Sequence, residues 1–202
     1  MSQYDNQDIQ WIRETVDQYE QRLTLYAAKI LGDIEKAQDV VQDTFLKLCN
    51  AGLEKVKQHV APWLYTVCRN GALDILREKK KHNQMDDRLT SWKAGDNPGP
   101  AHDAEQKEST SKMLSLLGDL PEHQQEMITL RFQHDLTYRQ IAKVTNRSVS
   151  TVGYLIHEGL NTLKQWMEDG QKPSTKSQET QGWYEDCDLP DDNKITELTE
   201  KP

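Results

Sequence analysis

Residues 136–164 constrain the fold of this chain more than any other part of its sequence. Ile141 and Val144 follow Thr137 at helical spacing, and threonine is a residue type that caps a helix through its side-chain oxygen. Asn146 comes next, and asparagine tolerates the left-handed backbone conformation that a tight turn needs. The pattern therefore predicts a short helix that ends in a sharp turn.

A second amphipathic helix is expected after this turn, capped by Ser148 or Ser150. Its inward positions recur at three- and four-residue steps and are Val152, Ile156, Gly159 and Leu163. Its opposite face carries short or planar polar groups, at Ser150, Tyr154, His157, Glu158 and Asn161. Such groups can exchange hydrogen bonds with base edges, so the segment predicts a helix-turn-helix whose second helix enters a DNA major groove. An ordinary helical hairpin would show the same periodicity.

The composition of the chain favours small helical domains. The chain has 202 residues, of which 35% are hydrophobic and 29% are charged. That is enough for two small domains but not for one large core with a catalytic cleft. No run approaches the roughly 18 apolar residues of a membrane span, and the first residues lack the basic and apolar segments of a secretion signal. We therefore expect a cytoplasmic protein.

The sequence contains no arrangement of residues typical of catalysis or metal binding. No pair of histidines has metal-ligand spacing, and neither a glycine-rich phosphate loop nor a nucleophile motif is present. The cysteines, at Cys49, Cys68 and Cys187, are odd in number and widely spaced, which disfavours disulfides and zinc sites. We expect Cys49 and Cys68 to face the core. The chain is therefore not expected to be an enzyme, to have catalytic residues or to need a cofactor or metal ion.

Charge is unevenly distributed along the chain. The net charge of −8 is unusual for a protein that binds nucleic acid, but residues 170–202 carry 8 acidic and 4 basic side chains and so account for half of it. Within residues 136–164, the only acidic residue is Glu158, and the basic ones are Arg139, Lys143, Arg147 and Lys164. This local excess of positive charge suits contact with phosphate.

We predict an all-α protein of two small helical domains joined by a flexible linker. Residues 1–85 are expected to form the first domain and residues 105–169 the second, which ends in the helix-turn-helix. Residues 86–104 lack periodicity and contain glycine and proline, so they are predicted to be the linker. Residues 170–202 are polar and acidic, and we expect them to be mostly disordered.

Three helices are expected in the first domain. One spans residues 8–31 and stops at Gly32, and Asp33 can cap the next, so these two should pack antiparallel. A third should begin near Pro62, because proline suits the first helical turn. In the second domain, a helix over residues 105–117 should precede a helix that buries Met127, Ile128 and Phe132.

Three segments carry a resemblance to a known family. Residues 36–48 read Lys-Ala-Gln-Asp-Val-Val-Gln-Asp-Thr-Phe-Leu-Lys-Leu, and residues 63–77 read Trp-Leu-Tyr-Thr-Val-Cys-Arg-Asn-Gly-Ala-Leu-Asp-Ile-Leu-Arg. Residues 120–132 read Leu-Pro-Glu-His-Gln-Gln-Glu-Met-Ile-Thr-Leu-Arg-Phe and run directly into the helix-turn-helix. In this order and separation, over about 160 residues, the chain resembles the two conserved domains of bacterial sigma factors of the extracytoplasmic-function (ECF) group.

The resemblance implies a protein without catalytic chemistry that docks on RNA polymerase core, directs it to specific promoters and helps to melt them. In this family the acidic-faced helix of the first domain binds the polymerase, which implies polymerase-binding roles for Asp39, Gln42, Asp43 and Lys47. These four recur at helical spacing away from the apolar stripe, so they should share one exposed face. A merely solvated face would show the same spacing.

The resemblance also places the upstream edge of the melted start region at the third helix. The implied DNA-binding residues there are Trp63, Arg69, Asn70 and Arg77, with Lys79, Lys80 and Lys81 beyond them. Flat rings can stack on opened bases, at roughly 1–3 kcal/mol each, and cations can follow the phosphates. Burial of Trp63 in the core is an equal alternative, and the lysines could serve solubility alone. In the helix-turn-helix, the predicted DNA-binding residues are Arg139, Arg147, Ser150, Thr151, Tyr154 and His157.

The predicted recognition helix departs from the family pattern. Relatives usually carry several Arg or Lys residues after its Thr-Val pair, whereas this chain has Gly153, Leu155, Glu158, Leu160 and Asn161. The affinity of this helix for DNA phosphates should therefore be weak. The extra leucines, Leu155 and Leu160, are alternatively part of a surface that binds a protein partner. Glycine within a helix also costs about 1 kcal/mol relative to alanine, which applies to Gly153 and Gly159.

Residues 183–192, Trp-Tyr-Glu-Asp-Cys-Asp-Leu-Pro-Asp-Asp, extend beyond the usual family ending. We hypothesise that this acidic tail folds back on a basic surface or binds a regulator, with a plain solubilising tail as the alternative. The resemblance further implies that promoter DNA is a partner and that an anti-sigma protein could be another. A helix-turn-helix regulator that acts without polymerase is the alternative function, but it explains only the second half of the chain.

Overall fold

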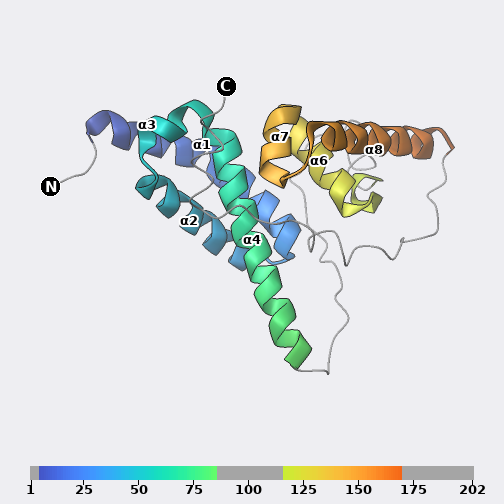
Figure 1. Ribbon diagram of the computed structural model, residues 1–202, viewed down its shortest axis with the longest axis horizontal. Helices are drawn as coiled ribbons and strands as arrows, with labels where there is room; N and C mark the ends of the chain where they lie inside the picture. Colours follow the sequence, from blue (N-terminus) through green and yellow to red (C-terminus); the bar gives the residue numbers. More distant parts are fainter. Residues whose placement is uncertain (1–4, 86–115, 170–202) are drawn as a thin grey trace, which may run out of the picture. The chain divides into compact units, whose positions relative to one another are not determined.

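The computed structural model describes residues 5–85 and 116–169, and every regular element within these two ranges is a helix (Figure 1). The chain divides into two compact units, one containing residues 5–85 and the other residues 116–169. The prediction of an all-α chain with two helical domains is therefore confirmed. The predicted linker, most of the helix over residues 105–117 and the acidic tail lie outside the described ranges. No helix within these ranges is both long enough and apolar enough to cross a membrane.

Two antiparallel helices begin the first unit, as predicted. α1 spans Asn6–Leu31 and α2 spans Ile34–Asn50. Gly32 ends α1 in the left-handed conformation, at a φ of 66°, which glycine adopts readily because it lacks a Cβ atom. The Asp33 carboxylate then accepts hydrogen bonds from two backbone N–H groups in the first turn of α2. The bond from the Lys36 N–H is the main reason why the pKa of Asp33 lies below its usual range.

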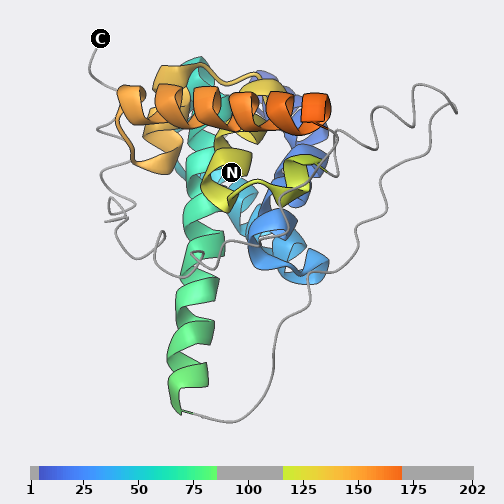
Figure 2. The ribbon, with the colours of Figure 1, turned by 90° about the vertical axis from the view of Figure 1, so that its right-hand side faces the viewer.

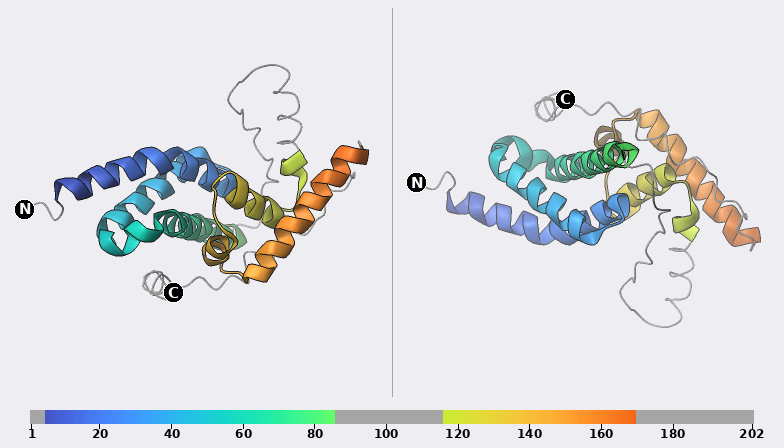
Figure 3. Two further views of the ribbon diagram at one scale, coloured as in Figure 1. Left: turned by 90° about the horizontal axis from the view of Figure 1, so that it is seen from above. Right: turned by 90° about the horizontal axis from the view of Figure 1, so that it is seen from below.

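The third long helix, α4 (Val60–Met85), packs against both α1 and α2 (Figure 3). The short helix α3 (Leu53–Val56) and the 3-10 helix η1 (Lys57–His59) lead into it, and the sequence pattern did not predict them. Because α4 is covered by two helices, every residue in the range 62–70 is buried. A helix that is enclosed on more than one side needs a buried surface wider than one apolar stripe.

Lys57 ties the connection before α4 to the beginning of α1. Its ammonium group donates to the Asp8 carboxylate over 2.8 Å and to the Glu54 carboxylate over 3.1 Å. It also lies 5.9 Å from the centroid of the Trp11 ring, within the range of a cation–π contact. The hydrogen bond to Asp8 is the largest cause of the raised pKa of Lys57. The contacts with Asp8 and Trp11 join residues far apart in sequence, so they help to hold this connection against the beginning of α1.

The second unit is formed mainly by α6 (Glu122–Phe132), α7 (Tyr138–Thr145) and α8 (Val149–Asp169), and both shorter helices pack against α8 (Figure 2). Met127 and Ile128 are buried, as predicted. Phe132 is 59% exposed, so the prediction that it is buried is wrong. Phe132 is the last residue of α6 and lies beyond its buried run, which ends at Leu130.

The turn between α7 and α8 has the predicted geometry. Thr137 and Gln140 form a reciprocal capping box at the beginning of α7. Asn146 ends α7 in the left-handed conformation, at a φ of 52°. The Ser148 hydroxyl accepts a hydrogen bond from the Thr151 N–H over 3.0 Å, so Ser148 rather than Ser150 caps α8. The helix-turn-helix predicted from the sequence is confirmed as a structure.

The close approach of α8 to α6 depends on Gly159. A Cβ atom at this position would lie 2.8 Å from Ile128 Cδ1 and 3.3 Å from Gln124 Cβ. The missing side chain therefore lets two helices pack closely, which offsets the poor helix propensity of glycine. Leu155 is also buried, at 6% exposure, so the hypothesis that it marks a protein surface is wrong. It packs inside the unit beside the predicted inward positions.

The two glycines of α8 predict opposite effects of substitution. Gly159→Val should lower the free energy of unfolding by about 2 kcal/mol or more, because the added methyl groups overpack the contact with α6. Gly153→Ala is the matched control, since a Cβ atom there would meet only the Tyr138 ring, at 3.7 Å. It should raise stability by up to about 1 kcal/mol through helix propensity. Urea unfolding followed by circular dichroism measures both, and equal effects of the two changes would contradict this packing.

The two described cysteines should differ in reactivity. Burial raises the pKa of the Cys68 thiol to about 12, whereas Cys49 is only partly buried. Since the thiolate is the reactive form, Cys49 should be alkylated in the native chain and Cys68 should be protected. Mass spectrometry of the chain treated with iodoacetamide, with and without denaturant, tests this. Alkylation of Cys68 at the rate of Cys49 in the native chain would contradict its burial.

Candidate nucleic-acid and protein interfaces

The predicted polymerase-binding residues share one exposed face of α2. Asp39, Gln42, Asp43 and Lys47 are all exposed in the structure. Their three- and four-residue spacing places them one above another along the helix, while Val40, Val41 and Leu48 are buried on the other side. The structure therefore brings these four side chains together, as their spacing predicted.

An exposed leucine lies within this polar face. Leu46 is 61% exposed, and it follows Gln42 by four residues and Asp43 by three. Sequence reasoning missed Leu46, since it assigned this residue neither to the apolar stripe of the helix nor to its polar face. Its helical spacing from the two polar residues was the available signal. A large apolar side chain surrounded by polar groups is the typical composition of the centre of a protein-binding surface.

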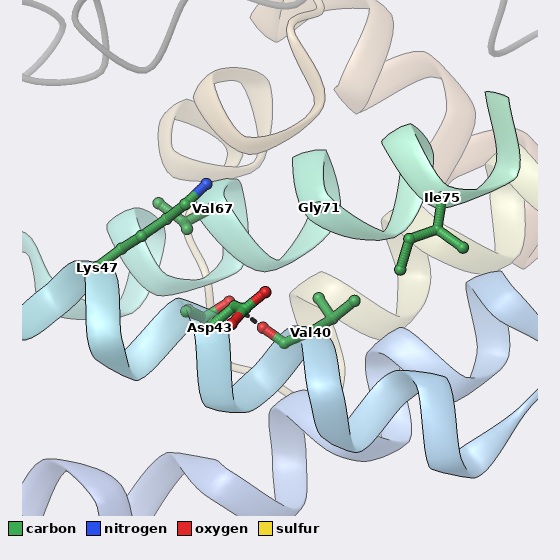
Figure 4. A pocket seen from close by; sticks show the side chains of 7 residues that line it. Val40, Asp43, Lys47, Val67, Gly71 and Ile75 are labelled. Carbon is green, nitrogen blue, oxygen red and sulfur yellow. Dashed lines mark hydrogen bonds between the residues drawn. The ribbon is translucent and has the colours of Figure 1, made fainter. Parts of the chain in front are cut away.

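A shallow hollow of about 110 Å³ lies beside this face, where α2 crosses α4 (Figure 4). Asp43 and Lys47 line it from α2, and Val67, Gly71 and Ile75 line it from α4. Small-molecule sites usually occupy about 300–1,000 Å³, so this hollow is too small for a typical ligand. It has the size of a single side chain and extends the exposed face of α2 onto α4.

Three of the predicted DNA-binding residues on α4 lie in the core. Trp63 is 7% exposed, Arg69 is 1% exposed and Asn70 is 7% exposed. The structure does not place Arg69 and Asn70 on an exposed DNA-contacting surface, because α1 and α2 together cover the first half of α4. For Trp63, burial is the alternative that the sequence left open. The sequence reading treated α4 as a helix with one apolar stripe, and this left Arg69 and Asn70 on an exposed face.

The last turns of α4 keep their cations at the surface. Lys80 and Lys81 are exposed, and Lys79 is partly exposed. The Arg77 guanidinium donates to the Asp74 carboxylate over 3.3 Å, with 40% of its side chain exposed. These side chains lie beyond the part of α4 that α1 and α2 bury. Together, Arg77, Lys79, Lys80 and Lys81 form the basic end of α4, as the sequence predicted.

The outward face of α8 is exposed but nearly without charge. Ser150, Tyr154 and His157 are exposed, and Thr151 is partly buried. The Asn161 side-chain amide lies 3.0 Å from His157 Nε2 and donates to it in the tautomer that leaves this nitrogen unprotonated. A hydrogen bond to Glu158 raises the pKa of Tyr154. Neighbouring polar side chains on this face therefore orient one another.

The cations of the helix-turn-helix lie on α7 and in the turn. Arg139 and Lys143 are four residues apart and both exposed, which places them on one face of α7. Arg147 is partly buried, and its charge adds to desolvation in lowering the pKa of His123. The Arg147 guanidinium therefore lies near the beginning of α6 as well as near the turn. Of the two arginines predicted to bind DNA from the helix-turn-helix, Arg139 is the more exposed.

Sequence reasoning missed an aromatic contact between α6 and α7. The Arg131 guanidinium lies 5.9 Å from the centroid of the Tyr138 ring, and its Nη1 donates to the Leu136 carbonyl over 3.2 Å. Tyr138 is 39% exposed and also reaches the surface of α8 beside Gly153. Arg131 and Tyr138 lie on different helices, so helical spacing along the sequence does not predict that they meet. The connection between α6 and α7 determines the distance between the two side chains.

Two family models match the chain, one for each unit. Residues 15–82 match the model described as Sigma-70 region 2. Residues 111–163 match the model described as Sigma-70, region 4. The first match contains the exposed face of α2 and most of α4, and the second contains α6, α7 and most of α8. The two surfaces described above therefore lie within the matched regions.

Relatives match the chain across both units. It is 30% identical over 134 residues to the ECF RNA polymerase sigma factor RpoE of Cereibacter sphaeroides, covering 66% of this chain and 71% of that protein. It is 24% identical over 165 residues to the ECF RNA polymerase sigma factor SigW of Bacillus subtilis, covering 77% and 88%. A solved structure, the sigma factor RpoE with the anti-sigma factor NepR from Bartonella quintana, has a TM-score of 0.59 at 19% identity, covering 79% of this chain and 98% of that one. This last likeness shows a shared fold.

Burial predicts that Arg69 supports the fold and that Arg77 does not. Arg69→Ala should lower the free energy of unfolding by about 2–4 kcal/mol, because it removes a large side chain that is fully enclosed. Arg77→Ala, the matched control on the same helix, removes a partly exposed ion pair and should change stability by less than about 1 kcal/mol. Chemical denaturation tests both changes. An Arg69→Ala chain of unchanged stability that loses single-stranded DNA binding would reverse the assignment.

Proposed function

The chain belongs to the sigma-70 family of RNA polymerase sigma factors, in its ECF group, and from this premise we propose that it directs RNA polymerase core to specific promoters and helps to melt them. Sigma factors are regulatory proteins, and we propose that this chain has no catalytic chemistry of its own. We propose that the chain acts in the cytoplasm, where RNA polymerase and the chromosome are located. The observation that supports this function most is the presence of both matched units in one chain.

The exposed face of α2 is the proposed docking surface for the polymerase core. Asp39 and Asp43 supply negative charge, and Leu46 supplies an apolar group at the centre of the face. Binding energy at protein interfaces is concentrated in a few well-packed groups surrounded by polar contacts that exclude water. Leu46 has this position, and the hollow lined by Asp43 and Lys47 could receive a side chain of the partner. The carboxylates would set the orientation and rate of docking.

The basic end of α4 is the proposed contact with melted DNA. Arg77, Lys79 and Lys80 lie at or near the surface of this end, and Lys81 extends it. Cations in this arrangement can follow the phosphates of an opened strand, and their contribution should fall as salt is raised. We do not include Trp63, Arg69 and Asn70 in this surface, because their side chains are buried.

The helix-turn-helix is the proposed reader of the upstream promoter element. Tyr154, His157 and Asn161 present hydrogen-bonding groups on the outward face of α8, with Ser150 and Thr151 at its beginning. These neutral groups can read base edges but give little attraction to phosphate. Arg139 and Lys143 on α7 would supply that attraction from the neighbouring helix. Recognition would therefore divide between two helices, one for bases and one for the backbone.

Regulation by an anti-sigma protein is part of the proposal. The similar solved structure from Bartonella quintana contains a sigma factor bound to the anti-sigma factor NepR. A regulator that acts without polymerase, the alternative function, is not favoured because it assigns no role to the unit that matches region 2.

Transcription with purified core polymerase tests the proposed function. Addition of the full chain should produce transcripts that start at specific sites in a genomic promoter library. Asp39→Lys together with Asp43→Lys should weaken binding to core by roughly tenfold or more, because reversed charges repel the partner as well as losing an attraction. Leu46→Ala should weaken it through loss of apolar contact.

The control for these variants is another exposed carboxylate of the same unit. Glu20→Lys on α1 also changes a negative charge to a positive one, at a position outside the α2 face, and should leave binding to core unchanged. Binding to core and transcription that are insensitive to the α2 variants would remove this face from the proposal. A chain that binds duplex DNA tightly but never associates with core would favour the regulator instead.

A further inference from the structure

Two pairs of side chains are linked by hydrogen bonds on the outward face of α8. The Asn161 amide nitrogen lies 3.0 Å from His157 Nε2. The Tyr154 hydroxyl is hydrogen-bonded to the Glu158 carboxylate. In each pair the second residue follows the first by four positions, which is a spacing at which side chains meet along a helix. Since Tyr154 and His157 are themselves three positions apart, the two pairs share one side of α8.

The carboxylate of Glu158 fixes the hydrogen-bonding role of the Tyr154 hydroxyl. An ionised carboxylate only accepts hydrogen bonds, so the single hydrogen of the hydroxyl points to Glu158. The hydroxyl oxygen then has only lone pairs left for a further partner. Tyr154 is 62% exposed, so a large partner can approach this side chain. Tyr154 is therefore an acceptor for whatever binds the outward face.

The amide of Asn161 fixes the role of the His157 ring in the opposite sense. An amide nitrogen only donates, so His157 Nε2 accepts from it and carries no hydrogen in the neutral ring. A neutral imidazole has one N–H group, which must then be at Nδ1. His157 is exposed, so its Nδ1–H group can donate to a partner. The face thus presents an acceptor and a donor at neighbouring positions.

Tyr154 and His157 lie nearer the beginning of α8 than their partners do. α8 begins at Val149, and the first turns of a recognition helix are the part that meets base edges. We propose that Glu158 holds Tyr154 as an acceptor for a base edge, an assignment that rests on the proposed function. Asn161 in the same way holds His157 as a donor. Glu158 and Asn161 are therefore positioning residues for promoter reading.

The two fixed roles determine which bases this face prefers. In the major groove, adenine and cytosine present an amino group, whereas guanine and thymine present a carbonyl oxygen. An acceptor at Tyr154 matches the amino group of adenine or cytosine. A donor at His157 matches guanine, thymine or the N7 atom of adenine, so it disfavours only cytosine. Tyr154 therefore gives the sharper base preference.

The orientation of one hydroxyl hydrogen matters more in a complex with DNA than in the free chain. In the free chain water competes for both exposed pairs, so their hydrogen bonds contribute little to stability. In the major groove water is displaced, and two donors that face each other are both left without an acceptor. An unmade hydrogen bond costs more than a made one contributes. The positioning residues would therefore act on base preference and not on the fold.

Nitrogen NMR of the full chain tests the His157 pair without DNA. With isotopically labelled histidine at alkaline pH, the His157 ring should carry its hydrogen mainly on Nδ1, and His157→Gln identifies its signals. Asn161→Ala should shift the tautomer ratio by roughly twofold or more toward Nε2–H, because it removes the donor to Nε2. Gln165→Ala is the matched control, since it removes an exposed amide one turn further along α8. A ring that is mainly Nε2–H, or a ratio indifferent to Asn161→Ala, would overturn the role of Asn161.

A promoter library randomised in the upstream element tests the Tyr154 pair in the holoenzyme. Sequencing of the bound DNA gives the base preference at each position, and the position read by Tyr154 is the one where Tyr154→Phe removes the preference. There the unchanged chain should prefer adenine or cytosine over guanine or thymine by roughly threefold or more. The preference is a ratio within one library, so a uniform change in phosphate affinity cancels.

Variants of Glu158 separate positioning from direct contact. Glu158→Lys donates to the Tyr154 oxygen and turns the hydroxyl hydrogen toward DNA, so the preference should reverse to guanine or thymine. Glu158→Gln is nearly isosteric and can either accept or donate, so it should weaken the preference without reversing it. The double variant Tyr154→Phe with Glu158→Lys should show no reversal, because the effect of Glu158 passes through the hydroxyl.

Glu168→Lys is the matched control, because it reverses another exposed carboxylate of α8, one that lies beside Lys164 near the end of the helix. It should leave the base preference unchanged. A preference that neither Glu158 variant alters, or a reversal that persists with Tyr154→Phe, would overturn the positioning role while the proposed function stands. An unchanged chain that binds core but selects no upstream sequence would overturn both.

Discussion

The burial of α4 between α1 and α2 is the constraint on which the first unit depends. It buries every residue in the range 62–70, and exposed residues appear on α4 only from Asp74 onward. α2 is thereby held with its apolar side against α4 and its polar side outward, so Asp39, Asp43 and Leu46 form one surface. The same packing places Arg69 in the core. An arginine, a residue type suited to DNA contact, thus becomes part of the core that supports the exposed face of α2.

In the second unit, the approach of α6 to α8 has the corresponding role. Gly159 lets the two helices pack more closely than any side chain would allow, and Ile128 occupies the space. The capping box at Thr137 and the left-handed Asn146 then set where α7 ends and α8 begins. These contacts orient the outward face of α8 without contributing to that face. Substitutions in this packing would therefore change the proposed reading of DNA only through the fold.

Charge is largely separated from the neutral hydrogen-bonding groups on the outward face of α8. α8 carries neutral side chains outward, α7 carries Arg139 and Lys143, and residues 183–192 carry a run of carboxylates. Exposed electrostatic contacts are long-ranged and sensitive to salt, whereas hydrogen bonds to base edges are short-ranged and directional.

The sequence by itself determined the long helices of the first unit and the helix-turn-helix, because these follow from local rules: Gly32 and Asn146 end helices, Asp33 and Thr137 begin them, and apolar residues recur at helical spacing. It did not predict the short α3 and η1. It also determined the shared face of Asp39, Gln42, Asp43 and Lys47, since spacing along one helix is enough for that. Only the tertiary structure decided that Trp63, Arg69 and Asn70 are buried, that Leu155 faces inward while Leu46 does not, and that Arg131 meets Tyr138. How many sides of a helix are covered depends on its neighbours, and one helix's periodicity contains no information about them.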